Sequence, residues 1–313
     1  MIFDPSRIEG RPRWLDAFAQ APATLVFDHF VRVYFACRPA PDERGQYVSR
    51  LAYVDLQRDD LTRVVGIAAA PVMPLGGRGT FDEFGTYPLS VAREGDLIHG
   101  YYGGWTRCAS VPFDVAIGHA MSRDGGVTFE KQGAGPVLAA GLHEPFVISG
   151  PKIRRFNERW HLFYIAGVKW IPAEPRPEPV YRIRMATSED GVHWVREGRE
   201  LIAPRVEADE CQASPDVIHA GGRFHMFFCY RHSLGYRGRE KGYRIGYASS
   251  LDLATWQRDD SKAGIDISDE GWDSEMVAYP HVFELDGRTW MLYLGNQVGR
   301  QGFGLAELEG TLA

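Results

Sequence analysis

One short pattern recurs five times along this chain of 313 residues. In each copy a proline is followed by an aromatic-rich segment, and consecutive prolines lie 66, 63, 64 and 65 residues apart. The prolines are Pro22, Pro88, Pro151, Pro215 and Pro280, and the aromatic-rich segments are 31–35, 99–102, 161–164, 225–228 and 290–293. A fixed period of this size indicates one supersecondary unit that is copied along the chain.

The fourth copy shows what this unit is. A first strand is predicted at 214–219 and a second at 223–231, joined by a tight turn with Gly221 and Gly222, since glycine supplies the positive φ that hairpins need. A third strand with alternating faces follows at 243–249, and a fourth opens at 255–258. Four antiparallel strands per copy make a propeller blade, so we predict an all-β, five-bladed β-propeller.

The predicted blades fill the chain as a single domain. Their approximate limits are 14–75, 76–140, 141–205 and 206–265, and the fifth blade combines 266–313 with 1–9. The fifth copy lacks a fourth strand, because the chain stops soon after the third strand at 302–308. We therefore expect the N-terminal segment to complete the last blade and close the ring, which protects strand edges that would otherwise be open.

Composition and charge exclude several classes of function. The formal net charge of -6 gives no reason to expect nucleic acid or an anionic membrane as partner. No apolar run reaches transmembrane length, and Asp4 stands where a signal peptide would carry basic and then apolar residues, so we expect a cytoplasmic protein. The four cysteines form no CxxC pair and no His/Cys cluster has zinc spacing, so no cofactor is predicted. Nothing in the sequence specifies an oligomeric state.

Three blades carry a glutamate at the same offset from their proline. The first strands of a propeller line its central channel, and the mouth of the channel is the deepest concavity. Five residues before the proline stand Glu83, Glu210 and Glu275. Converging carboxylates shift each other's pKa values, and glycoside cleavage uses two carboxyl groups across the scissile bond. The alternative is that these glutamates cap loops or pair with arginines at the rim.

The residue after the proline is polar in the last three blades. These residues are Lys152, Asp216 and His281. Lys152 and His281 could bind an anion or sugar hydroxyls, and Asp216 could act as a base or orient another group. The alternative is a buried Lys152–Asp216 pair that holds adjacent blades together. A channel cation held by Asp216 and His281 is a further hypothesis.

The ends of the second strands add candidates for substrate binding. Aromatic rings beside polar side chains suit a sugar, whose ring faces are apolar and whose edge carries hydroxyls, although propeller packing also explains the aromatics. The side chains concerned are Arg38, Trp105, Arg107, Lys169, Trp170, Tyr230, Arg231, His232, Asn296 and Arg300.

The five proline units, together with the Ser-x-Asp-Gly turns that begin at Ser122 and Ser188, resemble the five-bladed propeller glycosidases. These comprise the arabinanase/xylosidase group (glycoside hydrolase family 43), the invertase group (family 32) and the mannoside phosphorylases (family 130). The resemblance spans the chain and implies the fold and chemistry at a glycosidic bond. The chain departs from the pattern near Pro22, which has no adjacent aspartate, and in blade three, which has no Arg-Asp-Pro motif. The Glu-Cys-Pro-Asp acid motif of the invertase group is split here into 210–211 and 214–216.

Two hypotheses for function follow. The first is a carbohydrate-active enzyme that cleaves or transfers a glycosidic bond of a carbohydrate or glycoside substrate, by hydrolysis, phosphorolysis or transfer. In it Glu210 or Glu275 is the general acid, and Glu83 or Asp216 is the base or nucleophile. The residues expected to bind substrate or phosphate are Lys152, Arg231, His232, His281, Trp105, Arg107, Trp170 and Asn296. The second hypothesis is a non-catalytic sugar-binding or scaffold propeller derived from such enzymes.

Overall fold

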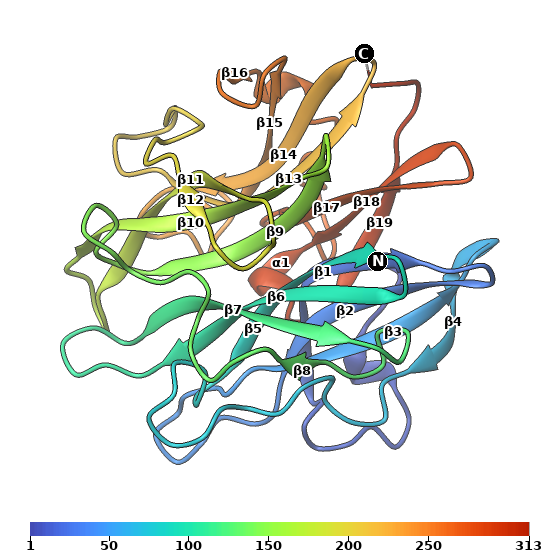
Figure 1. Cartoon of the computed structure of the whole chain (residues 1–313), viewed down its shortest axis with the longest axis horizontal. Helices are drawn as coiled ribbons and strands as arrows, with labels where there is room; N and C mark the ends of the chain where they lie inside the picture. Colours follow the sequence, from blue (N-terminus) through green and yellow to red (C-terminus); the bar gives the residue numbers. More distant parts are fainter. Residues whose placement is uncertain (313) are drawn as a thin grey trace.

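A computed structural model, described here for residues 1–312, shows five antiparallel sheets arranged around a central axis (Figure 1). This confirms the prediction of an all-β, five-bladed β-propeller. The first blade is made of β1 (Ala17–Val26), β2 (Phe30–Arg38), β3 (Arg50–Gln57) and β4 (Asp60–Ile67). The second is made of β5 (Thr86–Glu94), β6 (Leu97–Thr106), β7 (Asp114–Ser122) and β8 (Glu130–Lys131).

The remaining blades repeat this order. The third is made of β9 (Ile148–Phe156), β10 (Arg159–Ile171), β11 (Glu178–Ser188) and β12 (Val195–Arg196). The fourth is made of β13 (Cys211–Ala220), β14 (Arg223–Arg231), β15 (Arg244–Ser250) and β16 (Gln257–Arg258). The fifth is made of β17 (Ala278–Leu285), β18 (Arg288–Leu294) and β19 (Phe303–Glu307). Short helical turns occur at η1 (Pro5–Arg7), η2 (Asp260–Lys262) and α1 (Asn296–Gly299).

The innermost strands close a ring. In order around the axis, β1 contacts β5, β5 contacts β9, β9 contacts β13, β13 contacts β17, and β17 contacts β1 again. These are the five strands that carry the repeat prolines. Side chains on them therefore approach each other from blades that are far apart in the sequence.

Each inner strand has an irregularity at its proline. The register with the second strand shifts between the residue two positions before the proline and the residue directly after it in all five blades. Proline lacks the N–H that a regular ladder requires, which explains why the ladder is interrupted there. The residue before the proline has a positive φ in four blades, at Ala21 (50°), Gly150 (61°), Ser214 (52°) and Tyr279 (52°), and Tyr87 precedes its proline through a cis peptide bond. A bulge of this kind re-aims a side chain.

The Ser-x-Asp turns join neighbouring blades. Asp124 Oδ1 accepts hydrogen bonds from the backbone N–H of Val127 and of Thr128, both at 3.0 Å. Tyr34 of the first blade donates to the carbonyl of Gly126 in this turn (2.7 Å). Tyr101 of the second blade donates in the same way to Gly191 of the third (2.8 Å). These turns therefore have a structural role.

The N-terminal segment lies at the outer edge of the fifth blade. Phe3 and Phe303 form one antiparallel bridge, with Phe303 N donating to Phe3 O (3.1 Å). The buried Phe3 ring packs against Phe303 (5.2 Å between centroids) and against Phe35 of the first blade (5.1 Å). The segment thus takes the place of the missing outer strand, with a single bridge, and helps to join the last blade to the first.

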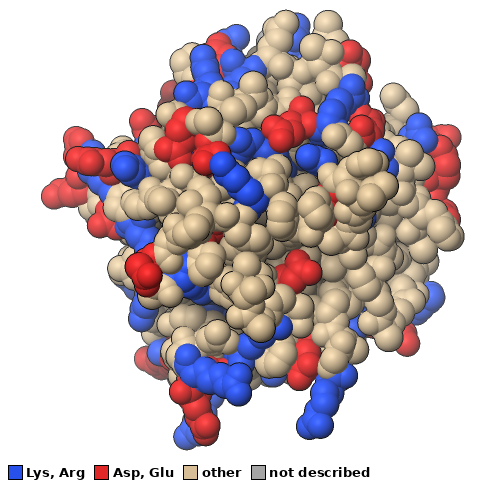
Figure 2. Space-filling model, turned by 90° about the vertical axis from the view of Figure 1, so that its left-hand side faces the viewer, with Lys and Arg blue, Asp and Glu red and all other residues tan. Residues whose placement is uncertain are grey.

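Charged side chains of both signs are interspersed over the face shown in Figure 2, with neutral residues between them. Cys37, Cys211 and Cys229 are buried, Cys108 is exposed, and all four are free thiols. Within residues 1–312 no helix has the length and apolar character needed to cross a bilayer.

Candidate functional site

A cavity of about 680 Å3 opens where the inner strands converge. Its lining includes the residue before the repeat proline from every blade: Ala21, Tyr87, Gly150, Ser214 and Tyr279. The bulges therefore turn one residue of each inner strand towards the cavity. Backbone held in sparsely populated φ regions clusters at functional sites, and the volume is in the usual range for small-molecule sites.

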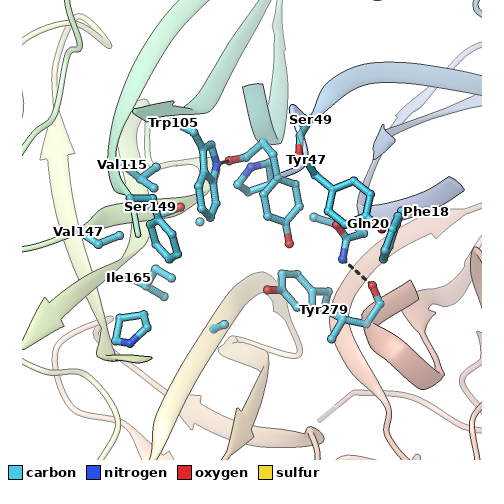
Figure 3. A pocket seen from close by; sticks show the side chains of 18 of the residues that line it. Phe18, Gln20, Tyr47, Ser49, Trp105, Val115, Val147, Ser149, Ile165 and Tyr279 are labelled. Carbon is cyan, nitrogen blue, oxygen red and sulfur yellow. Dashed lines mark hydrogen bonds between the residues drawn. The ribbon is translucent and has the colours of Figure 1, made fainter. Parts of the chain in front are cut away.

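The walls of the cavity carry both apolar and polar side chains (Figure 3). Apolar side chains of blades two and three, including Val115, Val147 and Ile165, lie across the space from Gln20 and Tyr47 of blade one. Sugars present both apolar ring faces and hydroxyl edges, so a cavity lined by both apolar and polar side chains can accommodate both.

Aromatic rings are fixed in place on this lining. Trp105 donates its indole N–H to the carbonyl of Tyr87 (2.6 Å), and its ring packs against Phe113 (4.5 Å between centroids). The ring centroid of Tyr87 lies 6.4 Å from that of Tyr279, which lines the cavity from the fifth blade. Flat rings that are held rigidly offer a contact surface with little loss of side-chain entropy on binding.

The lining is strongly cationic, although the protein as a whole carries a net charge of -6. Seven basic side chains line the cavity: Arg38, Arg107, Lys152, Arg176, Arg231, Arg237 and Arg300. Among residues 1–312, Glu178 is the only carboxylate in the lining. Its Oε2 accepts from Tyr236 (3.1 Å) and its Oε1 from Arg237 (3.4 Å).

Arg231 is buried in a cage of tyrosines. Its Nε donates to the hydroxyl of Tyr243 (3.0 Å), its Nη2 donates to the hydroxyl of Tyr181 (3.1 Å), and its guanidinium lies 3.6 Å from the ring centroid of Tyr236. Its Nη1 donates to the carbonyls of His232 and Ser233. An arginine side chain keeps its charge in proteins, so this guanidinium places a fixed positive charge behind the wall of the cavity.

Beneath the cavity floor, polar residues of the inner strands form a buried cluster. Lys152 Nζ lies 3.3 Å from both Asp216 Oδ2 and His281 Nδ1, and Arg154 forms an ion pair with Asp216 Oδ1. This is the Lys152–Asp216 pair between adjacent blades that the sequence offered as an alternative. Burial opposes ionisation of Asp216, but the charges of Arg154 and Lys152 outweigh it and hold its pKa well below the usual range.

His281 is neutral in this cluster. The backbone N–H of Thr24 donates to His281 Nε2 (2.9 Å), so Nε2 carries no proton, and Nδ1–H donates to Asp216 Oδ2 (2.6 Å). Burial lowers the pKa of His281 to about 4, and the nearby Lys152 cation acts in the same direction. Burial also lowers the pKa of Lys152, which Asp216 only partly opposes. The cluster links blades one, three, four and five.

None of the four carboxylates expected to be catalytic lines the main cavity. Glu210 is fully buried, where it accepts from Arg258 (2.7 Å) and Gln212 (2.9 Å) and from two backbone N–H groups of its own loop. Burial opposes its ionisation, but these hydrogen bonds prevail and lower its pKa. A general acid needs a raised pKa, so this environment does not suit Glu210 to that role.

The other two glutamates also lie in loops. Glu83 accepts from the backbone N–H of Gly79 (2.8 Å), and Glu275 lines a separate cavity of about 310 Å3 with Trp272 and Asn296. The three glutamates precede their strands, and the propeller's pseudo-symmetry governs strands rather than the loops that lead into them. An equal offset from the proline therefore does not bring these carboxylates together.

Of the eight residues expected to bind substrate, four line the cavity: Lys152, Arg231, Trp105 and Arg107. The other four have other neighbours. His281 contacts Lys152, His232 bonds to Glu207 (2.8 Å), Trp170 packs edge-on against Phe113 (5.4 Å), and Asn296 accepts from the backbone N–H of Glu275 (2.7 Å).

Sequence reasoning missed the ring of residues before the prolines, and with it Tyr87 and Tyr279. It also missed Glu178 and Tyr236. The repeated proline was itself a signal for the ring, because a proline cannot donate to the ladder and so interrupts a strand where it occurs. For a metal ion, no group of three or more His, Cys, Asp or Glu side chains with suitable placement occurs within residues 1–312. The Lys152 ammonium supplies the cation next to Asp216 and His281.

Comparison with solved structures defines the class of the fold. The structure resembles a family-43 glycoside hydrolase described as thermostable (TM-score 0.68, 14% identity, covering 94% of this chain and 91% of that one). It also resembles a structure described as a glycoside hydrolase, with a TM-score of 0.74 and 15% identity, covering 97% of this chain and 90% of that one. A structure from work on the family-130 mannoside phosphorylases is similar with a TM-score of 0.69 and 16% identity, covering 93% of this chain and 84% of that one. The fold is thus the five-bladed β-propeller of glycoside hydrolases, which confirms the resemblance at the level of fold.

No family model matches the sequence. The protein belongs to the family of the uncharacterized protein Rv1502 of Mycobacterium tuberculosis (strain ATCC 25618 / H37Rv), with which it shares 34% identity over 309 residues, covering 98% of this chain and 97% of that protein. The uncharacterized protein MT1551 of strain CDC 1551 / Oshkosh matches to the same extent.

Proposed function

We propose that this protein is carbohydrate-active and that it binds a saccharide in the cavity at the ring of residues before the prolines. The observation that carries the proposal is the mixed lining, in which the aromatic rings of Trp105 and Tyr279 lie in the same cavity as the polar side chains of Gln20 and Tyr47. Aromatic faces contact the C–H faces of a sugar ring, and hydroxyl, amide and guanidinium groups bond its hydroxyls. The fold shared with glycoside hydrolases supports the same class of ligand.

A titration with a panel of saccharides, followed by ligand-observed NMR, tests this proposal. Trp105→Ala removes one of these rings and is expected to weaken binding of any sugar that binds the wild type by about tenfold, since a stacked aromatic contributes its buried area and about 0.5–1.5 kcal/mol beyond it. Trp290→Ala is the matched control, because Trp290 lies outside the cavity lining. Equal binding by wild type and Trp105→Ala would contradict the proposed site.

A second candidate function is cleavage or transfer at a glycosidic bond, with Glu178 as the acid–base group. The observation that favours it is the hydrogen bond from Tyr236 to Glu178 at the cavity wall (3.1 Å). The cavity lining within residues 1–312 has one carboxylate instead of the usual pair. Some glycosidases use a tyrosine nucleophile, and burial raises the pKa of Tyr236 to about 12, so Tyr236 would need Glu178 to accept its proton.

An NMR time course with pooled glycosides and nucleotide sugars, with and without phosphate, tests this second candidate. We expect Glu178→Gln and Tyr236→Phe each to abolish the appearance of new anomeric signals while sugar binding persists. Dependence of turnover on phosphate would identify a phosphorylase. Binding without turnover in the wild type would leave the non-catalytic sugar-binding propeller as the function, and turnover that survives in Glu178→Gln would remove Glu178 from the chemistry.

A further inference from the structure

Within residues 1–312, four arginines on the cavity lining have no carboxylate partner, and one of them, Arg231, instead donates to tyrosine hydroxyls and backbone carbonyls. The other three are Arg38, Arg176 and Arg300. Arg38 lies at the end of β2, Arg176 on the connection between β10 and β11, and Arg300 directly after α1. Within residues 1–312, no Asp or Glu oxygen comes within 4.0 Å of their side-chain nitrogens, whereas Arg107 pairs with Asp42 (2.6 Å) and Arg237 with Glu178 (3.4 Å). The positive charge of these three arginines is therefore not balanced locally.

Two of these guanidinium groups lie close to the same aromatic ring. The central carbon of Arg38 lies 4.6 Å from the Phe18 ring centroid, and that of Arg300 lies 5.7 Å from the same centroid. Arg38 also lies 5.2 Å from the ring of Tyr47 and 6.0 Å from that of Tyr87. The rings hold the guanidinium groups by their faces, which leaves the N–H edges for a ligand in the plane.

The Arg38 side chain has unused hydrogen-bonding capacity. Its Nε is buried and has no hydrogen-bond partner within residues 1–312. A buried donor without an acceptor lowers the free energy of unfolding, so such a donor in a folded protein calls for a structural or functional explanation. Burial lowers the pKa of Arg38, and the neighbouring charge of Arg176 acts in the same direction. A bound anion would supply both the missing acceptor and the missing charge.

The backbone next to Arg38 and Arg300 is strained at three non-glycine residues. Phe18 has a φ of 68°, and Gln297 and Val298 in α1 have φ values of 54° each. The carbonyl of Val298 accepts from the Gln20 side chain (2.6 Å), which ties α1 to the first blade beside the cavity (Figure 3). Non-glycine residues in this conformation persist only where the surrounding structure fixes them, and they cluster at ligand sites.

We infer that Arg38, Arg176 and Arg300 form a subsite for a negatively charged substituent of the saccharide, a carboxylate or a phosphate. This inference rests on the proposed function, because it names the class of sugar that the cavity takes. A planar guanidinium bonds a carboxylate or phosphate through two parallel N–H groups, which gives both affinity and orientation. Contact with the same Phe18 ring holds the guanidinium groups of Arg38 and Arg300 in one part of the lining.

Calorimetric titrations with matched sugars test the inference. The pairs are glucuronate against glucose, galacturonate against galactose, and glucose 1-phosphate against glucose. We expect at least one anionic member to bind more tightly than its neutral partner by about 10- to 100-fold, the range for hydrogen bonds to charged groups. The uronate pairs and the phosphate pair show whether the bound group is a carboxylate or a phosphate. Higher salt should reduce the affinity difference between the anionic and the neutral sugar.

Variants locate the effect. Arg300→Ala, at an exposed position, should remove most of the preference for the anionic sugar without loss of folding, and Arg38→Gln should do the same. Arg63→Ala is the matched control, since Arg63 is exposed on β4, lies outside the lining and makes the same change in net charge. If both Arg300→Ala and Arg38→Gln still bound the anionic sugar more tightly than the neutral one by the wild-type factor, the assignment of the arginine subsite would be overturned.

The remaining outcomes separate this inference from the proposed function. If neutral and anionic sugars bind equally, the subsite is wrong but the sugar-binding cavity stands. If no sugar of the panel binds, both fail. If inorganic phosphate alone competes as effectively as glucose 1-phosphate, the anion is a separate co-substrate and the inference that it belongs to the sugar is overturned.

Discussion

Asp216 is the only carboxylate of the buried cluster beneath the cavity, and it serves Lys152, Arg154 and His281 together. The carboxylate is fully buried, so neither cation can exchange it for water. Its position directly after the proline bulge places it on the central axis. At the residue scale, Asp216 joins blades three, four and five through these contacts, and it does not line the cavity.

Asp216→Asn should therefore destabilise the fold strongly. The substitution leaves Lys152 and Arg154 without their counter-ion in the interior, and breaking a buried ion pair costs about 3–5 kcal/mol of unfolding free energy. Urea unfolding measures the change. The control is Asp286→Asn, which removes a half-exposed partner of Arg58 and should cost at most about 1 kcal/mol. Similar losses in the two variants would contradict the role of Asp216.

The neutral state of His281 predicts a dependence on pH. Its pKa is about 4 in the folded state against an ordinary value of 6.5, so between these values the unfolded state takes up more protons than the folded one. The free energy of unfolding should consequently fall as the pH falls from about 6.5 to about 4. Lys152, Arg154 and Asp216 face the ring, and the two cations oppose its protonation.

Urea midpoints at pH 7 and pH 4.5 measure this effect in wild type and in His281→Gln. The variant should lose less stability on acidification, because it lacks one of the protons taken up on unfolding. His119, whose pKa burial lowers to about 4, contributes in the same window in both proteins. An unchanged pH dependence in the variant would show that His281 is not buried in its neutral form.

At the element scale, the Ser-x-Asp turns connect neighbouring blades by hydrogen bonds. Gly126 has a φ of 81°, and a Cβ at this position would overlap the hydroxyl of Tyr34 from the neighbouring blade. Gly125, directly before it, has a φ of 71° and open space around the same position. A side chain at Gly125 therefore has only the cost of the left-handed backbone conformation. A side chain at Gly126 has this cost and also disturbs the contact with Tyr34.

Gly125→Ala should lose about 1–2 kcal/mol of unfolding free energy, the cost of a left-handed conformation for a residue with a Cβ. Gly126→Ala should lose clearly more, because the added methyl also displaces Tyr34 and its hydrogen bond. Thermal and urea unfolding of the two variants provide the comparison. Equal losses would mean that the contact between Tyr34 and the turn does not stabilise the propeller.

At the scale of the whole molecule, ring closure depends on the N-terminal segment. The buried Phe3 ring lies between Phe303 of the last blade and Phe35 of the first. Phe3→Ala should cost about 3 kcal/mol, at the lower end of the range for a buried phenylalanine because the N-terminal segment can relax. Calorimetry would show the loss as a lower melting temperature. No change would mean that the first and last blades hold together without this segment.

The sequence predicted the molecule best where the signal was periodic. The proline period gave five blades and placed Lys152, Asp216 and His281 on the central axis, because regular strands obey the repeat. It did not predict the surroundings of Glu83, Glu210 and Glu275, since those residues lie in loops whose paths differ between blades. Glu178 and Tyr236 come together only through folding of separate blades, and no local pattern marks them.

The most direct test of the sugar-binding cavity is NMR of the tryptophan indole N–H groups. The protein has eight tryptophans, of which Trp105 lines the cavity, and a Trp105→Phe variant assigns its signal. On addition of a sugar that binds, the signal of Trp105 should shift while that of Trp290 stays in place. Binding that leaves Trp105 unperturbed and shifts other indoles would place the sugar elsewhere and contradict the proposed site.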